Sequence, residues 1–243
     1  ATAAPGETWP APRGGPLLRR DEHGRLFPGR KQLRGPEGEI GAVAWSPDGT
    51  RVAVGGGAKV WVWRWDGRAG LLGTFTGHEG TVRHLLWSPE GQRLLSGGDD
   101  ESARVFHIAD PGPGQPLRGH TGSISAIAWH PHGEEVATAS RDGSVRLWTL
   151  IPRALKRLPH REAVTAIAWH PEGTRLATAC NDGQVRIFSL DANTPLHEYK
   201  HDRTANSLAW SPDGQRLASA GGRCMQVTSG TGVSIQDCTP GGA

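Results

Sequence analysis

A five-residue phrase, Trp-(Ser/His)-Pro-x-Gly, recurs at even spacing along the chain and constrains its fold more than any other feature. The phrase begins at Trp45, Trp87, Trp129, Trp169 and Trp210, so that successive copies lie 40 to 42 residues apart. Such spacing is typical of proteins built from repeated units that stack on their neighbours. The sequence therefore predicts five repeats of about 41 residues each.

Each repeat contains short stretches in which apolar and polar residues alternate. The first stretch ends at the Trp and reads GAVAW, RHLLW, SAIAW, TAIAW or NSLAW, and a second follows the turn, as in RVAVGG and RLATAC. A third stretch such as SVRLW and a weaker fourth such as PLHEY complete the unit. Alternation with a period of two predicts β-strands. We therefore expect an all-β chain, a β-propeller of four-stranded antiparallel blades with five recognisable repeats.

Further residues stand at fixed distances from each Trp. Nine residues before it comes the second residue of a Gly-His pair, intact at Gly77-His78 and Gly119-His120 but altered to Gly35-Pro36, Pro159-His160 and Lys200-His201. Thirteen residues after it comes Asp100, Asp142 or Asp182, and nineteen after it Phe106, Trp148 or Phe188. With these residues the chain resembles the WD-repeat family over about residues 35 to 230. Repeats one and five depart from the pattern, because neither has the turn Asp.

The resemblance implies a buried hydrogen-bonded set in each central repeat. In repeat three the set would be His120, Thr138 or Ser140, Asp142 and Trp148, and in repeats two and four it would be His78, Ser96, Asp100 and His160, Thr178, Asp182. Such sets are structural, because a buried imidazole needs hydrogen-bond partners. A hydrolytic triad would occur once and in a cleft, whereas this trio recurs, and no nucleophile elbow or phosphate-binding loop is present. We expect no enzymatic activity.

The resemblance also places a partner-binding face on the loops beside these sets. The predicted face residues are Arg83, Asp99, Ser123, Ser125, Arg141, Thr165, Asn181 and Asn206. They are polar and include no bulky aromatic residue, which favours a protein or peptide partner over a small-molecule substrate. The predicted function is that of an interaction scaffold or sensing module within a larger regulatory assembly. The alternative is nucleic-acid binding through a basic N-terminal arm.

Residues 1–34 form that arm, with seven Arg or Lys against three Asp or Glu, while the whole chain carries +3. The charges are not arranged as a dense run, which argues against nucleic-acid binding. The remaining residues, 35–243, hold repeats at about 35–76, 77–118, 119–158, 159–199 and 200–243. The arm could close the ring by supplying the outer strand of the last blade around RLFPGRKQL; otherwise the chain would be part of a larger ring.

Three cysteines are too few for a disulfide framework, so we expect reduced thiols and a cytoplasmic location. A hairpin over residues 224 to 238 would nevertheless bring Cys224 and Cys238 face to face. No apolar run approaches the ~18 residues of a membrane span. His130, His132 and His170 lack the Cys or carboxylate ligands of a metal site, so we expect no metal or other cofactor.

Overall fold

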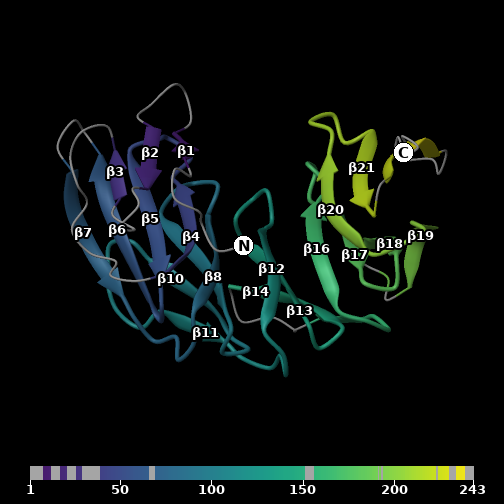
Figure 1. The fold of residues 1–243 in the computed structure, drawn as a ribbon. Coiled ribbons are helices and arrows are strands. Elements are labelled where there is room, and N and C mark those ends of the chain that lie inside the picture. The colour runs from purple at the N-terminus through teal and green to yellow at the C-terminus, as the bar shows by residue number, and fades with distance from the viewer. Residues whose placement is uncertain are drawn as a thin grey trace. The chain divides into compact units, whose positions relative to one another are not determined.

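The computed structural model describes residues 8–11, 17–20, 26–28, 39–65, 69–150, 156–190, 192, 194–222, 224–229 and 234–238. Within these ranges the chain forms strands and turns and no helix (Figure 1). The described residues accordingly contain no helix with the length and hydropathy needed to span a membrane. The predicted all-β fold class is confirmed.

Five four-stranded antiparallel sheets follow one another along the chain, and we call them blades 1 to 5. Blade 1 comprises β4 (Ile40–Trp45), β5 (Arg51–Gly56), β6 (Lys59–Trp65) and β7 (Ala69–Phe75). Blade 2 comprises β8 (Val82–Trp87), β9 (Arg93–Gly98), β10 (Ala103–His107) and β11 (Gln115–Leu117). Blade 3 comprises β12 (Ile124–Trp129), β13 (Glu135–Ser140), β14 (Ser144–Thr149) and β15 (Lys156–Pro159). Blade 4 comprises β16 (Val164–Trp169), β17 (Arg175–Cys180), β18 (Gln184–Ser189) and β19 (Pro195–Lys200). Blade 5 comprises β20 (Ala205–Trp210), β21 (Arg216–Gly221), β22 (Cys224–Ser229) and β23 (Ser234–Cys238).

The chain divides into two compact units, residues 1–119 and 120–243. The first unit holds blades 1 and 2, and the second holds blades 3, 4 and 5. In every blade the strands pair in chain order, so that each blade is a simple meander.

The Trp phrase forms the turn from the first strand to the second. In blade 1 the hydroxyl of Ser46 accepts a hydrogen bond from the backbone N–H of Arg51, 2.9 Å away, and donates to the Asp48 carboxylate. Gly49 adopts a φ of +71°, which side chains with a Cβ rarely tolerate. Ser46, Asp48 and Gly49 of the phrase thus each contribute to this turn.

Neighbouring blades within a unit pack their apolar faces together. Between blades 1 and 2, small residues such as Ala53 meet larger ones such as Leu94 and Phe106, all buried. The indole N–H of Trp87 in β8 donates to the carbonyl of Ala44 in β4, at 3.0 Å. In the second unit Trp210 makes the same bond to Ala168, at 3.2 Å. Trp87 and Trp210 therefore each join the first strands of two successive blades.

The N-terminal strands do not close the last blade. β1 (Thr8–Pro10), β2 (Leu17–Arg20) and β3 (Leu26–Pro28) form their own three-stranded sheet, and blade 5 has β23 as its fourth strand. The prediction that residues around RLFPGRKQL supply the closing strand is therefore wrong for the part that the structure describes. Leu18 of β2 is fully buried against Ile40, Val52 and Trp63 of blade 1. Pairing with β2 closes only a short loop, which costs less chain entropy than a distant pairing.

The cysteines also depart from expectation. Cys224 is disulfide-bonded, and its direct backbone partner across β22 and β23 is Cys238. Residues paired in this way lie within the Cα separation that a disulfide bridges. Cys180 in β17 is a buried free thiol. The expectation that all three thiols are reduced is therefore wrong for Cys224, because the hairpin places it opposite another cysteine.

Candidate functional site

Two loops gather at the same end of every central blade. One loop precedes the first strand and carries the His of the Gly-His position, and the other joins the second strand to the third and carries the turn Asp. Antiparallel pairing places them together, because the first strand begins where the second ends, as at Ile124 opposite Ser140. We call this end of a blade its His–Asp edge.

In blade 2 the set His78, Ser96 and Asp100 is brought together. Nδ1 of His78 donates to the carboxylate of Asp100 at 2.9 Å, and Nε2 accepts from the Ser96 hydroxyl at 2.6 Å. The carboxylate also accepts from the backbone N–H of Glu79 at 2.9 Å. Burial lowers the pKa of His78, although Asp100 opposes this shift. The neutral imidazole therefore holds the two loops together.

Blade 3 has the fullest set. His120 Nδ1 lies 2.9 Å from the Asp142 carboxylate, and Nε2 lies 2.8 Å from the Thr138 hydroxyl. The indole N–H of Trp148 donates to the same hydroxyl at 2.8 Å. Burial raises the pKa of Asp142, but hydrogen bonds from Ser144, Thr121 and His120 outweigh it and leave the pKa at about 2.

Ser140 is not a partner of His120, although the sequence left it as an alternative to Thr138. Its hydroxyl donates to the carbonyl of Gly122 at 2.7 Å and accepts from the backbone N–H of Asp142 at 3.0 Å. Ser140 is the last residue of its strand and lies beside the loop of residues 121–123. Its hydroxyl therefore bonds to backbone groups of the two loops and not to the imidazole. Ser140 thus anchors the turn and not the imidazole.

In blade 4 the expected set is incomplete, because Asp182 does not bond to His160. Nε2 of His160 lies 2.9 Å from the Thr178 hydroxyl, but Nδ1 donates to the carbonyl of Leu158 at 3.1 Å. Asp182 pairs instead with Arg186, at 2.8 Å. Burial lowers the pKa of His160 to about 4.

The residue before the histidine explains this difference. Gly77 and Gly119 precede the histidines of blades 2 and 3 with φ values of +110° and +141°. Blade 4 has Pro159 there, and its ring holds φ near −65°. The backbone of blade 4 cannot follow the path that brings the imidazole to the turn Asp. The Pro159-His160 pair was the sequence signal for this change.

Blade 5 contains a pair that the predicted sets omitted. His201 is buried, and its Nε2 lies 2.8 Å from the hydroxyl of Ser219. Ser219 occupies the position that Ser96 has in blade 2, nine residues after the Trp. The Lys200-His201 pair at the altered Gly-His position was the available signal.

The hydroxyls of these sets cannot act as nucleophiles in this structure. Ser96, Thr138 and Thr178 are each 0% exposed, so that no substrate reaches them. Among the described residues no group of three or more His, Cys, Asp or Glu side chains could hold a metal ion. What the sets can do is hold the loops of the His–Asp edge in place.

The predicted face residues behave in two ways, and the first group, Arg83, Ser125 and Thr165, is bound within the chain. Arg83, Ser125, Thr165 and Asn206 each stand where the register of the first strand shifts by one residue, which marks a β-bulge. The bulge turns the hydroxyl of Ser125 to the carbonyl of Val164 in blade 4, and that of Thr165 to the carbonyl of Ala205 in blade 5. These two hydroxyls are therefore seam contacts between blades.

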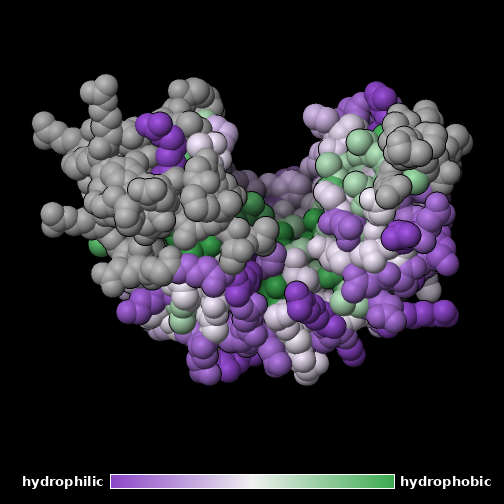
Figure 2. All heavy atoms as spheres, viewed as in Figure 1, coloured by the Kyte–Doolittle hydropathy of each residue, from purple (hydrophilic) through white to green (hydrophobic). Residues whose placement is uncertain are grey.

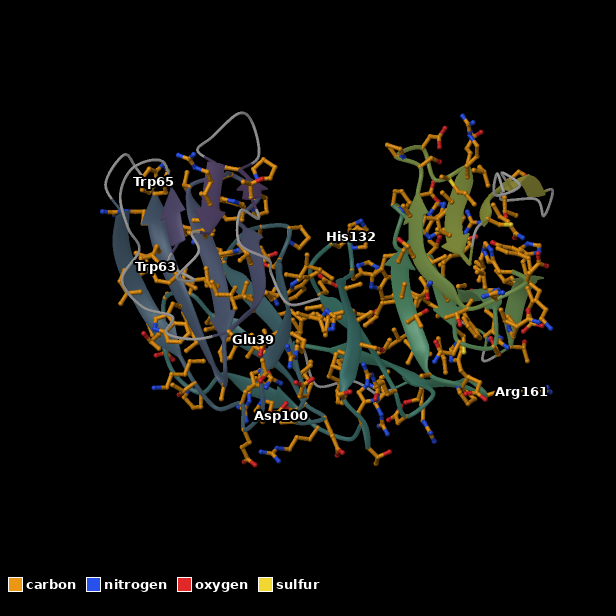
Figure 3. All side chains as sticks on the ribbon, in the orientation of Figure 1. Glu39, Trp63, Trp65, Asp100, His132 and Arg161 are labelled. Carbon is orange, nitrogen blue, oxygen red and sulfur yellow. The ribbon has the colours of Figure 1, made fainter. Side chains whose placement is uncertain are left out.

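Arg83 is also bonded to other residues of the chain. Its Nε donates to Asp99 at 2.8 Å and its Nη1 to Glu39 of blade 1 at 2.5 Å. The hydrogen bonds that the guanidinium donates to these two carboxylates raise its pKa. Figure 3 shows Glu39 and Asp100, the neighbour of Asp99, at the same end of the first unit.

The second group is exposed at the His–Asp edge. Arg141 and Asn181 each immediately precede a turn Asp, and their backbone N–H groups bond to the carbonyls of Ser123 and Ala163. No side chain among the described residues bonds to the Arg141 guanidinium. Asn206 is also exposed. In Figure 2 the side of each unit that carries these loops, at the bottom of the view, is mostly hydrophilic.

Known proteins were compared with the chain in two ways. The family model described as "WD domain, G-beta repeat" matches five segments, residues 29–64, 69–107, 112–149, 153–189 and 193–228. The search among curated proteins found no match.

Proposed function

This chain belongs to the WD-repeat family, and on that basis we propose that it is an interaction module that holds a protein or peptide partner at its His–Asp edges, within a larger regulatory assembly. Repeats of this family generally act as protein-interaction scaffolds. A scaffold needs exposed side chains on a backbone that does not move when a partner binds.

Arg141 carries this proposal. Its guanidinium is exposed and has no partner among the described side chains, whereas both of its neighbours are anchored. Ser140 bonds to the carbonyl of Gly122, and Asp142 bonds to His120 and to the backbone N–H of Thr121. The arginine is thus presented from a fixed turn, and exposed arginines in such positions often contribute strongly to protein interfaces.

The test compares capture of binding partners by the wild-type chain and by variants. We expect Arg141→Glu to weaken capture, and Arg83→Glu with Arg141→Glu to abolish it, while circular dichroism shows an unchanged fold. Arg216→Glu is the matched control, because Arg216 is exposed at the other end of its blade, where β21 begins. Unchanged binding by the folded double variant would refute the proposed face.

A further inference from the structure

Two arginines face each other across the outer hairpin of blade 3. Arg146 of β14 is the direct cross-strand partner of Arg157 of β15. Side chains at such positions share one face of the sheet with their Cβ atoms about 5 Å apart, and like charges there destabilise the pairing. The two guanidinium groups therefore repel each other, and an anion bound between them would relieve the repulsion.

Blade 4 has an arginine at the same place, and that arginine is paired. Arg146 and Arg186 are equivalent, because each lies directly opposite the threonine that bonds to the histidine of its blade. The residue opposite Arg186 on the outer strand is Glu198. The Arg186 guanidinium donates to Glu198 at 3.0 Å and to Asp182 at 2.8 Å. An arginine at this position thus binds two carboxylates in blade 4.

Arg146 has neither of these carboxylates. The residue opposite it is Arg157, and the turn Asp of blade 3, Asp142, is already occupied. The Asp142 carboxylate accepts hydrogen bonds from His120, from the backbone and hydroxyl of Ser144 and from one further backbone N–H, at 2.7 to 3.0 Å. The backbone path that brings the histidine of blade 3 to the turn Asp thus takes that Asp away from the arginine.

The Arg146 guanidinium has no hydrogen-bond or ion-pair partner in the part of the chain that the structure describes, and its Nε is buried without an acceptor. Its other neighbours on this face of the sheet are Thr138, Ser144 and Trp148, none of which is charged. Arg157 is exposed and likewise has no ion pair with any described residue. The pair therefore presents two positive charges and a buried donor that lacks its acceptor.

A phosphoryl group matches this pair better than a carboxylate does. A phosphate monoester carries a charge of about −1.5 to −2 at pH 7 and has three acceptor oxygens, so that it can accept from both guanidinium groups at once. A carboxylate has a single charge, and one arginine can fill both of its oxygens. In blade 4 the equivalent pair, Arg186 and Glu198, lines a cleft of about 560 Å³. This position of a blade can therefore be open to a ligand of that size.

We propose that Arg146 and Arg157 of blade 3 bind a phosphoryl group between their two guanidinium groups. The buried Nε–H of Arg146 gains the acceptor that it lacks, and Arg157 contributes its charge from the exposed side. The phosphoryl group comes either from a phosphorylated side chain of a protein partner or from free phosphate. This site does not rest on the function proposed above, because it uses neither Arg83 nor Arg141.

Three short peptides and inorganic phosphate serve as probes, each titrated into the whole chain at constant ionic strength. The first peptide is N-acetyl-Gly-Ala-phosphoserine-Ala-Gly-amide, the second is its unphosphorylated form, and the third has Glu in place of phosphoserine. The readouts are the NMR shifts of the Nε–H groups of Arg146 and Arg157. We expect the phosphopeptide to shift both, the unphosphorylated peptide to shift neither, and the Glu peptide to bind about tenfold more weakly than the phosphopeptide.

Inorganic phosphate distinguishes the two sources of the phosphoryl group. Tighter binding of the phosphopeptide than of inorganic phosphate would assign the group to a phosphorylated partner. Equal affinities would show that the site recognises the phosphoryl group alone, as it would for free phosphate.

Arg157→Glu is the decisive variant, because it gives blade 3 the pair that blade 4 has in Arg186 and Glu198. We expect it to abolish phosphopeptide binding and to raise the temperature of thermal unfolding, since a repulsive pair becomes an attractive one. Arg157→Gln, which only removes the charge, should weaken binding about tenfold. Arg216→Glu, which changes an exposed arginine on blade 5, is the matched control and should leave the affinity unchanged.

Three results would overturn the proposal. These are the absence of any shift at both arginines with the phosphopeptide, equal binding of the unphosphorylated or the Glu peptide, and wild-type affinity in a folded Arg157→Glu variant. Circular dichroism of each variant separates loss of binding from loss of fold. Arg157→Glu tests this site and Arg141→Glu tests the function proposed above, so that the failure of one is distinguishable from the failure of the other.

Discussion

The indole N–H of Trp87 donates to the backbone carbonyl of Ala44, 3.0 Å away, and so connects the first strands of blades 1 and 2. Trp169 holds the same place in blade 4 and is similarly buried, yet its indole nitrogen has no hydrogen-bond partner among the described residues. Two equivalent tryptophans thus differ by one hydrogen bond.

Replacement by phenylalanine should reveal this difference. Trp87→Phe leaves the Ala44 carbonyl without its donor, whereas Trp169→Phe removes a donor that was already unsatisfied. We expect Trp87→Phe to lower the free energy of unfolding by about 1–2 kcal/mol more than Trp169→Phe. Urea unfolding followed by circular dichroism measures both. Equal losses would show that the indole bond contributes nothing to the seam.

Gly41 should tolerate no side chain. A Cβ at this position would overlap the carbonyl oxygen of Val82 in the next blade, and backbone cannot move aside as a side chain can. Gly41→Ala should therefore destabilise the chain by roughly 2 kcal/mol or more. Gly70→Ala is the control, because nothing lies within 4 Å of its added Cβ. If thermal unfolding shows equal effects for the two, blades 1 and 2 are not packed as described.

The turn aspartates of blades 3 and 4 should differ in their contributions to stability. Asp142→Ala removes the partner of the buried His120 and should cost about 2–3 kcal/mol. Asp182→Ala should cost less, because its partner Arg186 keeps Glu198 and because His160 does not depend on it. Chemical denaturation of both variants is the measurement. A larger loss for Asp182→Ala would mean that Asp182 bonds to His160 in solution.

Acid should destabilise the chain in two steps. The folded-state pKa of His160 is about 4 against an ordinary value of 6.5, so the unfolded chain binds the extra proton first. Its contribution is fully present above pH 6.5 and is lost as the pH falls to about 4, by up to roughly 3 kcal/mol. Below about pH 4, protonation of Asp48 and Asp142 lowers the free energy of unfolding further, because their folded-state pKa values are about 2 against an ordinary value of 3.8.

Urea midpoints at about pH 7.5, 5 and 3 test this order. His160→Gln should reduce the first step without removing it, because burial also lowers the pKa values of His78, His120 and His201. Because Gln keeps a hydrogen-bonding side chain, the variant should remain folded. A midpoint that is unchanged between about pH 7.5 and 5 would contradict the assignment of the first step to a buried neutral histidine.

Much of the fold follows from the sequence because its determinants are local. The Trp phrase forms its turn with its own residues, as Ser46 and Asp48 show, and the alternating stretches form strands at that spacing. The Gly-His and Asp positions likewise indicated which loops meet. Pro159 also carried a signal, because proline cannot adopt the positive φ of Gly77 and Gly119. It would have indicated that the histidine of blade 4 does not bond to the turn Asp.

The bulges escaped sequence reasoning. The resemblance to the WD-repeat family predicts that the position four residues before each Trp belongs to the partner face. One extra residue in the first strand turns Ser125 and Thr165 toward the adjacent blade. No local signal marks a bulge of this kind, since it arises from the fit of two neighbouring sheets.

The sequence by itself determined the repeat, the strands and the residues available for hydrogen bonding, because these depend on neighbours along the chain. Only the tertiary structure decided which partner each polar group takes. Asp182 could meet His160 or Arg186, and residues 26–28 could pair with β2 or with a distant blade. Such choices depend on small differences between competing contacts, and those differences exist only when separate strands are brought together in space.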